Sequence, residues 1–140
     1  MIYKHSIRIP FQDIDAAGVV FFAHFFRYAH EAYEAFMREI RQPLDSLLAE
    51  GKIILPIVHT EADYRQPAGY AESMTVELKV EAIGESSFSL IYDFINAKGD
   101  CVAQIKTVHA CRDAQTKNKR RIAETLRTEL QTYQIAVSRD

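Results

Sequence analysis

The sequence predicts an α+β fold in which one antiparallel sheet packs against a long helix. Apolar residues recur every three or four positions over residues 22–40, which indicates an amphipathic helix. From residue 53 onward they alternate with polar residues, which indicates half-buried strands. Short turns between the later strands favour antiparallel pairing. Because the apolar stripe of the helix must be buried, a single sheet packed on that helix is the simplest arrangement.

The first half of the chain is expected to form one strand and two helices. A strand over residues 2–11 comes first, and the long helix over residues 22–40 follows. Pro43 then opens a short helix over residues 44–50, which Gly51 closes. The apolar positions of the long helix are Phe22, Phe25, Phe26, Ala29, Tyr33, Phe36, Met37 and Ile40.

Four more strands are expected in the second half, followed by a charged tail. The alternation is strictest between Met74 and Val80, where every second residue is apolar. The tail, residues 116–140, is expected to form an exposed or edge-packed helix around Leu126 and Leu130. No repeat or linker divides the chain, so one domain is predicted over residues 1–140. The four strands are expected at residues 53–65, 74–80, 88–94 and 101–112.

Composition and charge narrow the class of partner. The chain has 140 residues, 48% of them hydrophobic, and a formal net charge of −2. This balance argues against nucleic acid or an anionic membrane as the main partner, because phosphate binding leaves a basic footprint. The N-terminus has no signal-peptide pattern and no apolar stretch is long enough to span a bilayer, so a cytoplasmic location is expected. Cys101 and Cys111 are expected to be reduced thiols.

Several common catalytic motifs are absent. The sequence has no Gly-x-Ser-x-Gly elbow, no Gly-x-Gly-x-x-Gly loop and no Walker loop. The segment His30–Glu34 resembles the zinc signature His-Glu-x-x-His only until its last position, where a carboxylate replaces the second ligand. We therefore expect neither a metal nor a cofactor.

Two acidic residues stand directly before the apolar run that enters the long helix. Asp13 and Asp15 could simply cap or solvate this loop. Alternatively, a carboxylate near the free N–H groups of a helix start could act as a base or nucleophile while those groups polarise a carbonyl. From the residues alone both interpretations stay open.

The segment Phe11–Val20, followed by an aromatic-rich helix, resembles the signature of the 4-hydroxybenzoyl-CoA thioesterase family of hotdog-fold proteins. The resemblance extends over residues 3–112 and includes residues 55–59 and 63–68. It implies a curved five-stranded antiparallel sheet wrapped around one long helix. It also implies homodimers or homotetramers with acyl-CoA sites between subunits.

The resemblance assigns roles to individual residues. Asp15 matches the family's catalytic aspartate, whereas Asp13 is expected to orient the loop. The backbone N–H near Phe22 would hold the thioester oxygen. Several members of the family carry tyrosine or histidine at this position. Phenylalanine has no polar group, so a hydrogen bond from the side chain is absent here. Gly18, Phe21 and Arg65 are expected to contact the substrate. Further basic residues available for the CoA phosphates are Lys117, Lys119, Arg120 and Arg121.

Within the family, the chain resembles most closely the 1,4-dihydroxy-2-naphthoyl-CoA hydrolases. The segments Gly18–Phe22, His30–Glu34 and Leu55–His59 carry this likeness. An aromatic acyl group would suit the phenylalanines at the start of the helix, although Phe25 and Phe36 are expected in the core. Residues that could position water or substrate, or else serve only as structural or solvated residues, are Glu31, His24 and His59.

The predicted function is hydrolysis of an aromatic acyl-CoA thioester, with 1,4-dihydroxy-2-naphthoyl-CoA as the first candidate substrate. Asp15 would either attack the carbonyl or deprotonate a water molecule that does so. One alternative is a thioesterase of broad specificity for short and medium acyl chains. Another is a non-catalytic module that binds acyl-CoA or acyl carrier protein.

Overall fold

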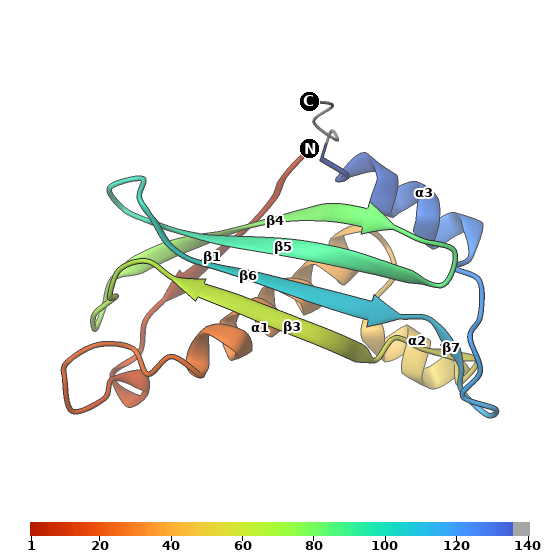
Figure 1. Cartoon of the computed structure of the whole chain (residues 1–140), viewed down its shortest axis with the longest axis horizontal. Coiled ribbons are helices and arrows are strands. Elements are labelled where there is room, and N and C mark those ends of the chain that lie inside the picture. The colour runs from red at the N-terminus through yellow and green to blue at the C-terminus, as the bar shows by residue number, and fades with distance from the viewer. Residues whose placement is uncertain (136–140) are drawn as a thin grey trace.

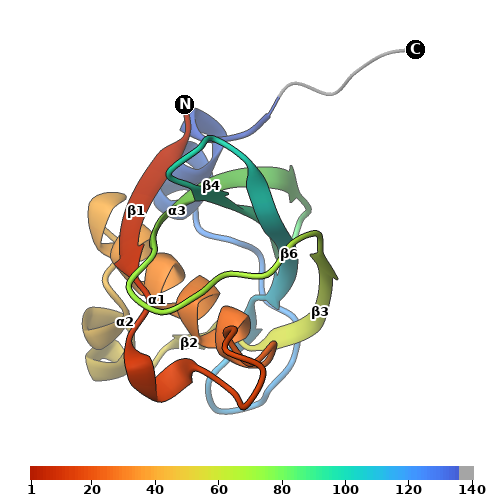
Figure 2. The ribbon, with the colours of Figure 1, turned by 90° about the vertical axis from the view of Figure 1, so that its left-hand side faces the viewer.

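The computed structural model describes residues 1–135 and has a five-stranded antiparallel sheet with strand order β1-β4-β5-β6-β3 (Figure 1). Figure 2 shows the sheet curving around helix α1 (His24–Glu39), which runs along its concave side. The predicted α+β fold and the predicted wrapping of one sheet around one long helix are confirmed. The strands are β1 (Tyr3–Arg8), β3 (Ile57–Tyr64), β4 (Ser73–Ile83), β5 (Ser87–Asn96) and β6 (Cys101–Ala110).

Four smaller elements and a final helix complete the described chain. A 3-10 turn, η1 (Phe11–Asp13), precedes α1, and α2 (Leu44–Glu50) follows it. Gly51 closes α2 with a φ of 64°, as the sequence predicts. The short strands β2 (Ile53–Ile54) and β7 (Arg112–Asp113) pair with each other, and α3 (Glu124–Thr132) comes last.

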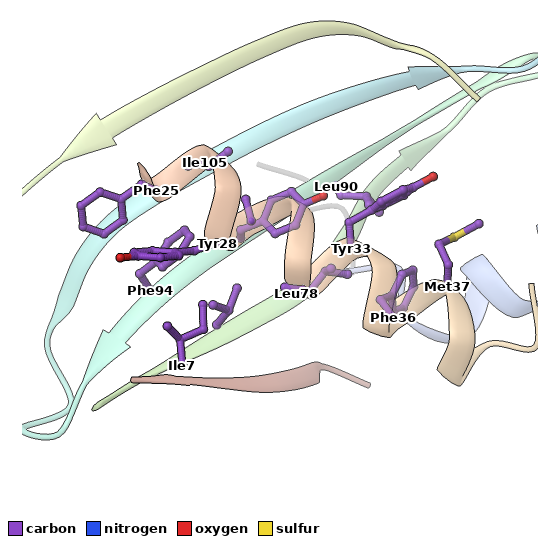
Figure 3. Packing of buried hydrophobic residues seen from close by; sticks show 14 of the residues in the cluster. Ile7, Phe25, Tyr28, Tyr33, Phe36, Met37, Leu78, Leu90, Phe94 and Ile105 are labelled. Carbon is purple, nitrogen blue, oxygen red and sulfur yellow. The ribbon is translucent and has the colours of Figure 1, made fainter. Parts of the chain in front are cut away.

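The core forms where alternate residues of the central strands face α1. Leu78, Tyr92 and Ile105 are consecutive partners across β4, β5 and β6, and each is at most 1% exposed. Phe36 of α1 is fully buried against this face (Figure 3). The predicted core position of Phe25, 4% exposed, is likewise confirmed. Burial of these side chains is the main favourable contribution to the stability of the fold.

Three predicted strands are too long. The strand expected at residues 53–65 is interrupted at Pro56, which has no N–H for a sheet hydrogen bond, and is therefore divided into β2 and β3. The strand expected at residues 101–112 breaks at Cys111, whose N–H donates to the Ser86 carbonyl at 2.8 Å instead of to a neighbouring strand. The first strand ends at Arg8, because Pro10 starts the 3-10 turn that follows.

The C-terminal helix packs into the core rather than lying exposed on the molecule. Leu126 and Leu130 are 2% and 0% exposed. Beyond α3, Val80 exchanges backbone hydrogen bonds with Tyr133 and Ile135, both at 2.9 Å, so the chain continues beside β4. The amino group of Met1 also donates to the Thr132 carbonyl, at 3.3 Å. Residues 136–140 of the predicted tail lie outside the described residues, and the prediction of one domain over residues 1–140 stays a prediction.

A buried histidine lies between the sheet and α1. The His109 ring stacks on Tyr33 with ring centres 4.5 Å apart and on Phe88 at 4.9 Å, and its Nε2 contacts the Thr107 hydroxyl at 2.9 Å. Burial disfavours the charged imidazolium and lowers the pKa of His109 to about 4. The ring is therefore neutral at physiological pH.

We expect the free energy of unfolding to decrease as the pH falls from about 6.5 to about 4. Over this range the unfolded chain binds a proton at His109 that the folded chain does not, so protonation favours unfolding, by about 3 kcal/mol at the lower limit. Urea unfolding followed by far-UV circular dichroism at several pH values measures the slope. A His109→Gln variant should lose most of it, and an unchanged slope in that variant would contradict this assignment.

Candidate active site

Asp15 lies on a tight loop that links η1 to α1. The Asp15 N–H donates to the Val19 carbonyl at 2.9 Å, and the Gly18 N–H donates back to the Asp15 carbonyl at 3.0 Å. Gly18 has a φ of 82°, in the left-handed region that favours glycine. On the far side of the loop, the Val20 N–H donates to the Ala68 carbonyl at 2.9 Å. These bonds fix the backbone of the Asp15 loop relative to the segment after β3.

The half-buried Asp15 carboxylate is held through one oxygen only. Its Oδ1 accepts hydrogen bonds from the N–H groups of Ala17 at 2.8 Å and Val19 at 3.4 Å. Its Oδ2 has no hydrogen-bond partner among residues 1–135. An oriented carboxylate with one unpaired oxygen is suited to act as a nucleophile or a general base.

Asp13 has a different environment, because its carboxylate is only 3% exposed. It accepts hydrogen bonds from the Tyr28 hydroxyl, at 2.5 Å, and from the Arg27 guanidinium, and His24 Nδ1 lies 3.9 Å away. Burial raises the pKa of the Asp13 carboxyl, but the hydrogen bonds from Tyr28 and Arg27 outweigh it, so the net pKa is below its usual value. Asp13 is thus a buried anion that ties the loop to α1, which fits the orienting role expected for it.

The start of α1 presents free backbone donors next to this loop. The Phe21 N–H donates to the Asp13 carbonyl at 3.0 Å, whereas the N–H groups of Phe22 and Ala23 have no backbone acceptor among residues 1–135. The N-cap residue, Ala23, offers no side-chain cap. Free N–H groups at the positive end of a helix dipole favour a negatively charged oxygen. The structure therefore brings a carboxylate and a potential oxyanion site to the same end of α1.

Aromatic side chains surround this end of α1. Phe21 and Phe22 are 47% and 56% exposed, and their rings lie 4.8 Å apart. Tyr64, the last residue of β3, packs edge-on against Phe22 and Phe25 and donates its hydroxyl proton to the Phe22 carbonyl at 3.2 Å. A hollow of about 340 Å³ beside these rings is lined by Phe22, Tyr64 and Arg65 among others. Arg65 therefore lies beside Phe22, at the edge of this hollow.

His24 lies at the loop, but two other predicted site residues lie elsewhere in this chain. Glu31 follows His24, the first residue of α1, by seven helical residues, about 10 Å, and its carboxylate is 3.7 Å from His5 on β1. His59 precedes Tyr64 by five strand residues, about 16 Å, and contacts Glu61 at 3.1 Å. Neither side chain meets Asp15 within one copy of the chain.

The basic residues of the tail lie at the opposite end of the sheet. The Lys117 N–H donates to the Asp113 carbonyl and the Arg120 N–H to the Cys111 carbonyl, which places both beside β7 (Figure 1). The loop that carries Asp15 lies at the other end of α1. Within one chain, these cations therefore lie far from Asp15.

Within residues 1–135, no group of three or more His, Cys, Asp or Glu side chains is arranged to hold a metal ion. None of the helices described is long and apolar enough to cross a membrane.

Three residues that shape the site were not found by sequence reasoning. Arg27 and Tyr28 hold Asp13, but nothing in the helical pattern links them to a residue about fifteen positions earlier. Tyr64 stands in the segment Asp63–Ala68, which contributes to the family resemblance without indicating a role for the side chain. The one feature of the sequence that could have pointed to Tyr64 is a hydroxyl group near the end of a predicted strand.

Comparison with known proteins gives one family. The family described as the thioesterase-like superfamily matches residues 9–130. A 1,4-dihydroxy-2-naphthoyl-CoA hydrolase from Synechococcus elongatus is 37% identical over 130 residues, covering 92% of this chain and 95% of the relative. The hydrolase of the same name from Trichodesmium erythraeum is 32% identical over 136 residues, covering 96% of this chain and 99% of the relative.

Solved structures of thioesterases superpose on this chain over most of its length. A 1,4-dihydroxy-2-naphthoyl-CoA thioesterase from Synechocystis superposes with a TM-score of 0.87 at 25% identity, covering 93% of this chain and 96% of the other. A dynemicin thioesterase, described in connection with polyene binding, superposes with a TM-score of 0.89 at 19% identity, covering 98% of this chain and 100% of the other. The second likeness concerns the fold alone.

We expect Tyr28→Phe to lower the free energy of unfolding by about 2 kcal/mol at neutral pH. The variant keeps the buried ring but removes a hydrogen bond to a buried carboxylate, and bonds to charged groups contribute about 1.5–3 kcal/mol. Urea unfolding measures the change. Tyr70→Phe is the matched control, because Tyr70 is 63% exposed, and it should leave stability unchanged. Equal stability of the two variants would show that the bond to Asp13 contributes nothing.

Proposed function

The chain belongs to the thioesterase-like superfamily, and from this premise we propose that it hydrolyses an aromatic acyl-CoA thioester, with 1,4-dihydroxy-2-naphthoyl-CoA as the leading substrate. The family resemblance inferred from the sequence is confirmed by this match and by the relatives that share at least 30% of their residues with the chain. The substrate is the one that those relatives are named for. Exposed aromatic rings at the start of α1 support an aromatic acyl group, since stacked rings bury a large area in a defined geometry.

One observation carries the catalytic proposal: the unpaired oxygen of Asp15 and the free N–H groups of Phe22 and Ala23 lie at the same end of α1. The N–H groups hold the thioester oxygen and stabilise the negative charge that develops on it. Because Phe22 has no polar side chain, the donor at this position is the backbone alone. Tyr64 fixes that backbone through its hydrogen bond to the Phe22 carbonyl.

Asp15 has two possible roles in the reaction. As a nucleophile, its Oδ2 forms a bond to the carbonyl carbon, the CoA thiolate leaves, and water then hydrolyses the mixed anhydride. As a general base, it takes a proton from the water that attacks the same carbon. A single turnover in water enriched in heavy oxygen tests for the nucleophilic route, because label enters the Asp15 carboxylate only when water attacks the Asp15 carbon of a mixed anhydride.

We expect Asp15→Asn to lower kcat/KM for aryl-CoA esters by about a hundredfold or more, because it removes the nucleophile or base while keeping the size of the side chain. Release of free CoA thiol from aryl, short-chain and long-chain esters measures the effect and ranks the substrates. Asp45→Asn, on the exposed face of α2, is the matched control and should behave as wild type.

The results also separate the alternatives. Wild-type protein that binds CoA esters but cleaves none would overturn the thioesterase proposal in favour of a binding module. Similar rates on aryl and short aliphatic esters would favour a thioesterase of broad specificity. Activity that survives in Asp15→Asn would move the catalytic carboxylate elsewhere.

The chain is further proposed to form a homodimer through the free edge of β3, either alone or as half of a tetramer. In the described residues β3 pairs with β6 on one side only, and Ile57 and Val58 on it are 43% and 53% exposed. An unpaired edge strand with exposed apolar residues is a template for a second strand. A cytoplasmic location stays a prediction.

The dimer is expected to weaken when charge is introduced on this edge. Val58→Lys should shift the protein toward monomer in sedimentation velocity, because a lysine on an edge strand opposes pairing of that edge with a second strand. Ile2→Lys, at the opposite edge of the sheet and 44% exposed in the wild type, serves as the control. A monomeric wild-type protein, or a Val58→Lys protein that stays dimeric, would contradict an interface at β3.

A further inference from the structure

Two cavities follow one another along α1, on the side that faces β3 and β6. The proximal cavity, about 310 Å³, is lined by Phe26 and Ala29 of α1 together with Tyr92 and Thr107 of the sheet. The distal cavity, about 320 Å³, lies between α1, α2 and the segment around β2, and is lined by Tyr33, Leu44, Leu47, Ile54 and Leu55 among others. His30 and Ile57 line both cavities, so they form a shared wall.

A row of side chains along α1 leads from the candidate site to these cavities. Phe22, Phe26, His30 and Tyr33 are spaced by four, four and three positions, which places them on one face of the helix. Phe26 comes one helical turn after Phe22, so the proximal cavity begins beside the proposed oxyanion site. Tyr33 follows Phe22 by eleven residues, about 16 Å along the helix axis. A bicyclic ring attached to the thioester carbonyl ends well before that distance.

The distal cavity is apolar apart from three residues. Seven of its lining residues are leucine or isoleucine, and two histidines lie at its wall: His30, which contacts Glu34 at 3.2 Å, and the buried His109. The third polar group is the hydroxyl of Tyr33, which projects from α1 toward the sheet (Figure 3). Tyr33 is only 3% exposed, yet its hydroxyl makes no hydrogen bond with any residue in the range 1–135. Because this hydroxyl borders the cavity and has no partner among the described residues, it is free to hydrogen-bond to the oxygen of a ligand there.

We propose that the distal cavity binds the far end of a long acyl group, one with an apolar body and a terminal hydroxyl or keto oxygen that hydrogen-bonds to Tyr33. The inference rests on the proposed thioesterase function, since it places the thioester at Asp15 and Phe22. It extends the substrate class beyond ring-sized acyl groups. Leucine and isoleucine side chains bury the body of the acyl chain, and Tyr33 distinguishes a chain with a terminal oxygen from one without it.

The test uses the full chain carrying Asp15→Asn, so that esters bind without being cleaved. Dissociation constants are measured by titration calorimetry for hexanoyl-CoA, dodecanoyl-CoA and ω-hydroxydodecanoyl-CoA. We expect the ω-hydroxy ester to bind about fivefold more tightly than dodecanoyl-CoA, the effect of one hydrogen bond of ordinary strength. Adding Tyr33→Phe should abolish this difference and leave dodecanoyl-CoA unchanged. The hexanoyl chain is too short to reach Tyr33 and should not respond.

A second variant fills the cavity itself. Leu47→Trp adds a bulky ring to the lining from α2 and should weaken binding of both dodecanoyl esters by about tenfold, with hexanoyl-CoA unaffected. Ala49→Trp is the matched control, because residue 49 is exposed on the same helix and does not line either cavity. In the active protein, Tyr33→Phe should raise KM for the ω-hydroxy ester without lowering kcat.

Equal binding of the hydroxylated and plain esters, or long-chain binding that Leu47→Trp leaves intact, would overturn the proposal. Either result would leave the proposed function standing if aryl esters are still cleaved in an Asp15-dependent way. If wild-type protein cleaves no ester while the differences in binding persist, the catalytic proposal fails and the distal cavity stands as a binding site. The two proposals can therefore fail separately.

Discussion

The buried carboxylate of Asp13 is the interaction on which the arrangement of the site depends. A charge removed from water is costly unless it is paired and hydrogen-bonded, and Tyr28 and Arg27 supply both compensations from the first turns of α1. Because the same residue also accepts the Phe21 N–H through its backbone, the loop cannot move independently of the helix. Asp15 and the free N–H groups of α1 are therefore held in one fixed relation before any substrate arrives.

The rest of the fold provides a rigid support for this end of the helix. Alternate residues of the sheet bury one face of α1 along its whole length, and Phe25 packs against Phe94 with ring centres 5.3 Å apart. The rings at the very start of α1 stay exposed by contrast, and so do the apolar residues of β3. Exposed apolar patches of this kind are typical of surfaces that meet a ligand or another copy of the chain. The proposed catalytic site and the proposed dimer interface therefore occupy neighbouring parts of one surface.

Much of this architecture can be predicted from the sequence, because the local spacing of apolar residues determines which elements form. The stripe that includes Phe36 and the alternation from Met74 to Val80 each specify an element and its buried face. Strand ends are less predictable, since Pro56 and Cys111 divide strands through single backbone groups. The burial of Leu126 and Leu130 depends on contacts with distant residues, and so do the partners of Asp13. Spacing along the chain cannot reveal such contacts.

The hydrogen bond from Met1 to the Thr132 carbonyl has a practical consequence. It brings the first residue and the end of α3 to the same corner of the molecule, while the Asp15 loop lies at the far end of α1 (Figure 1). A short peptide could bridge that corner and yield a circularly permuted protein, with new ends opened in the exposed turn at Lys98 and Gly99. Such a rearrangement would change the order of the strands along the chain. It would leave the Asp15 loop, the start of α1 and the edge of β3 intact.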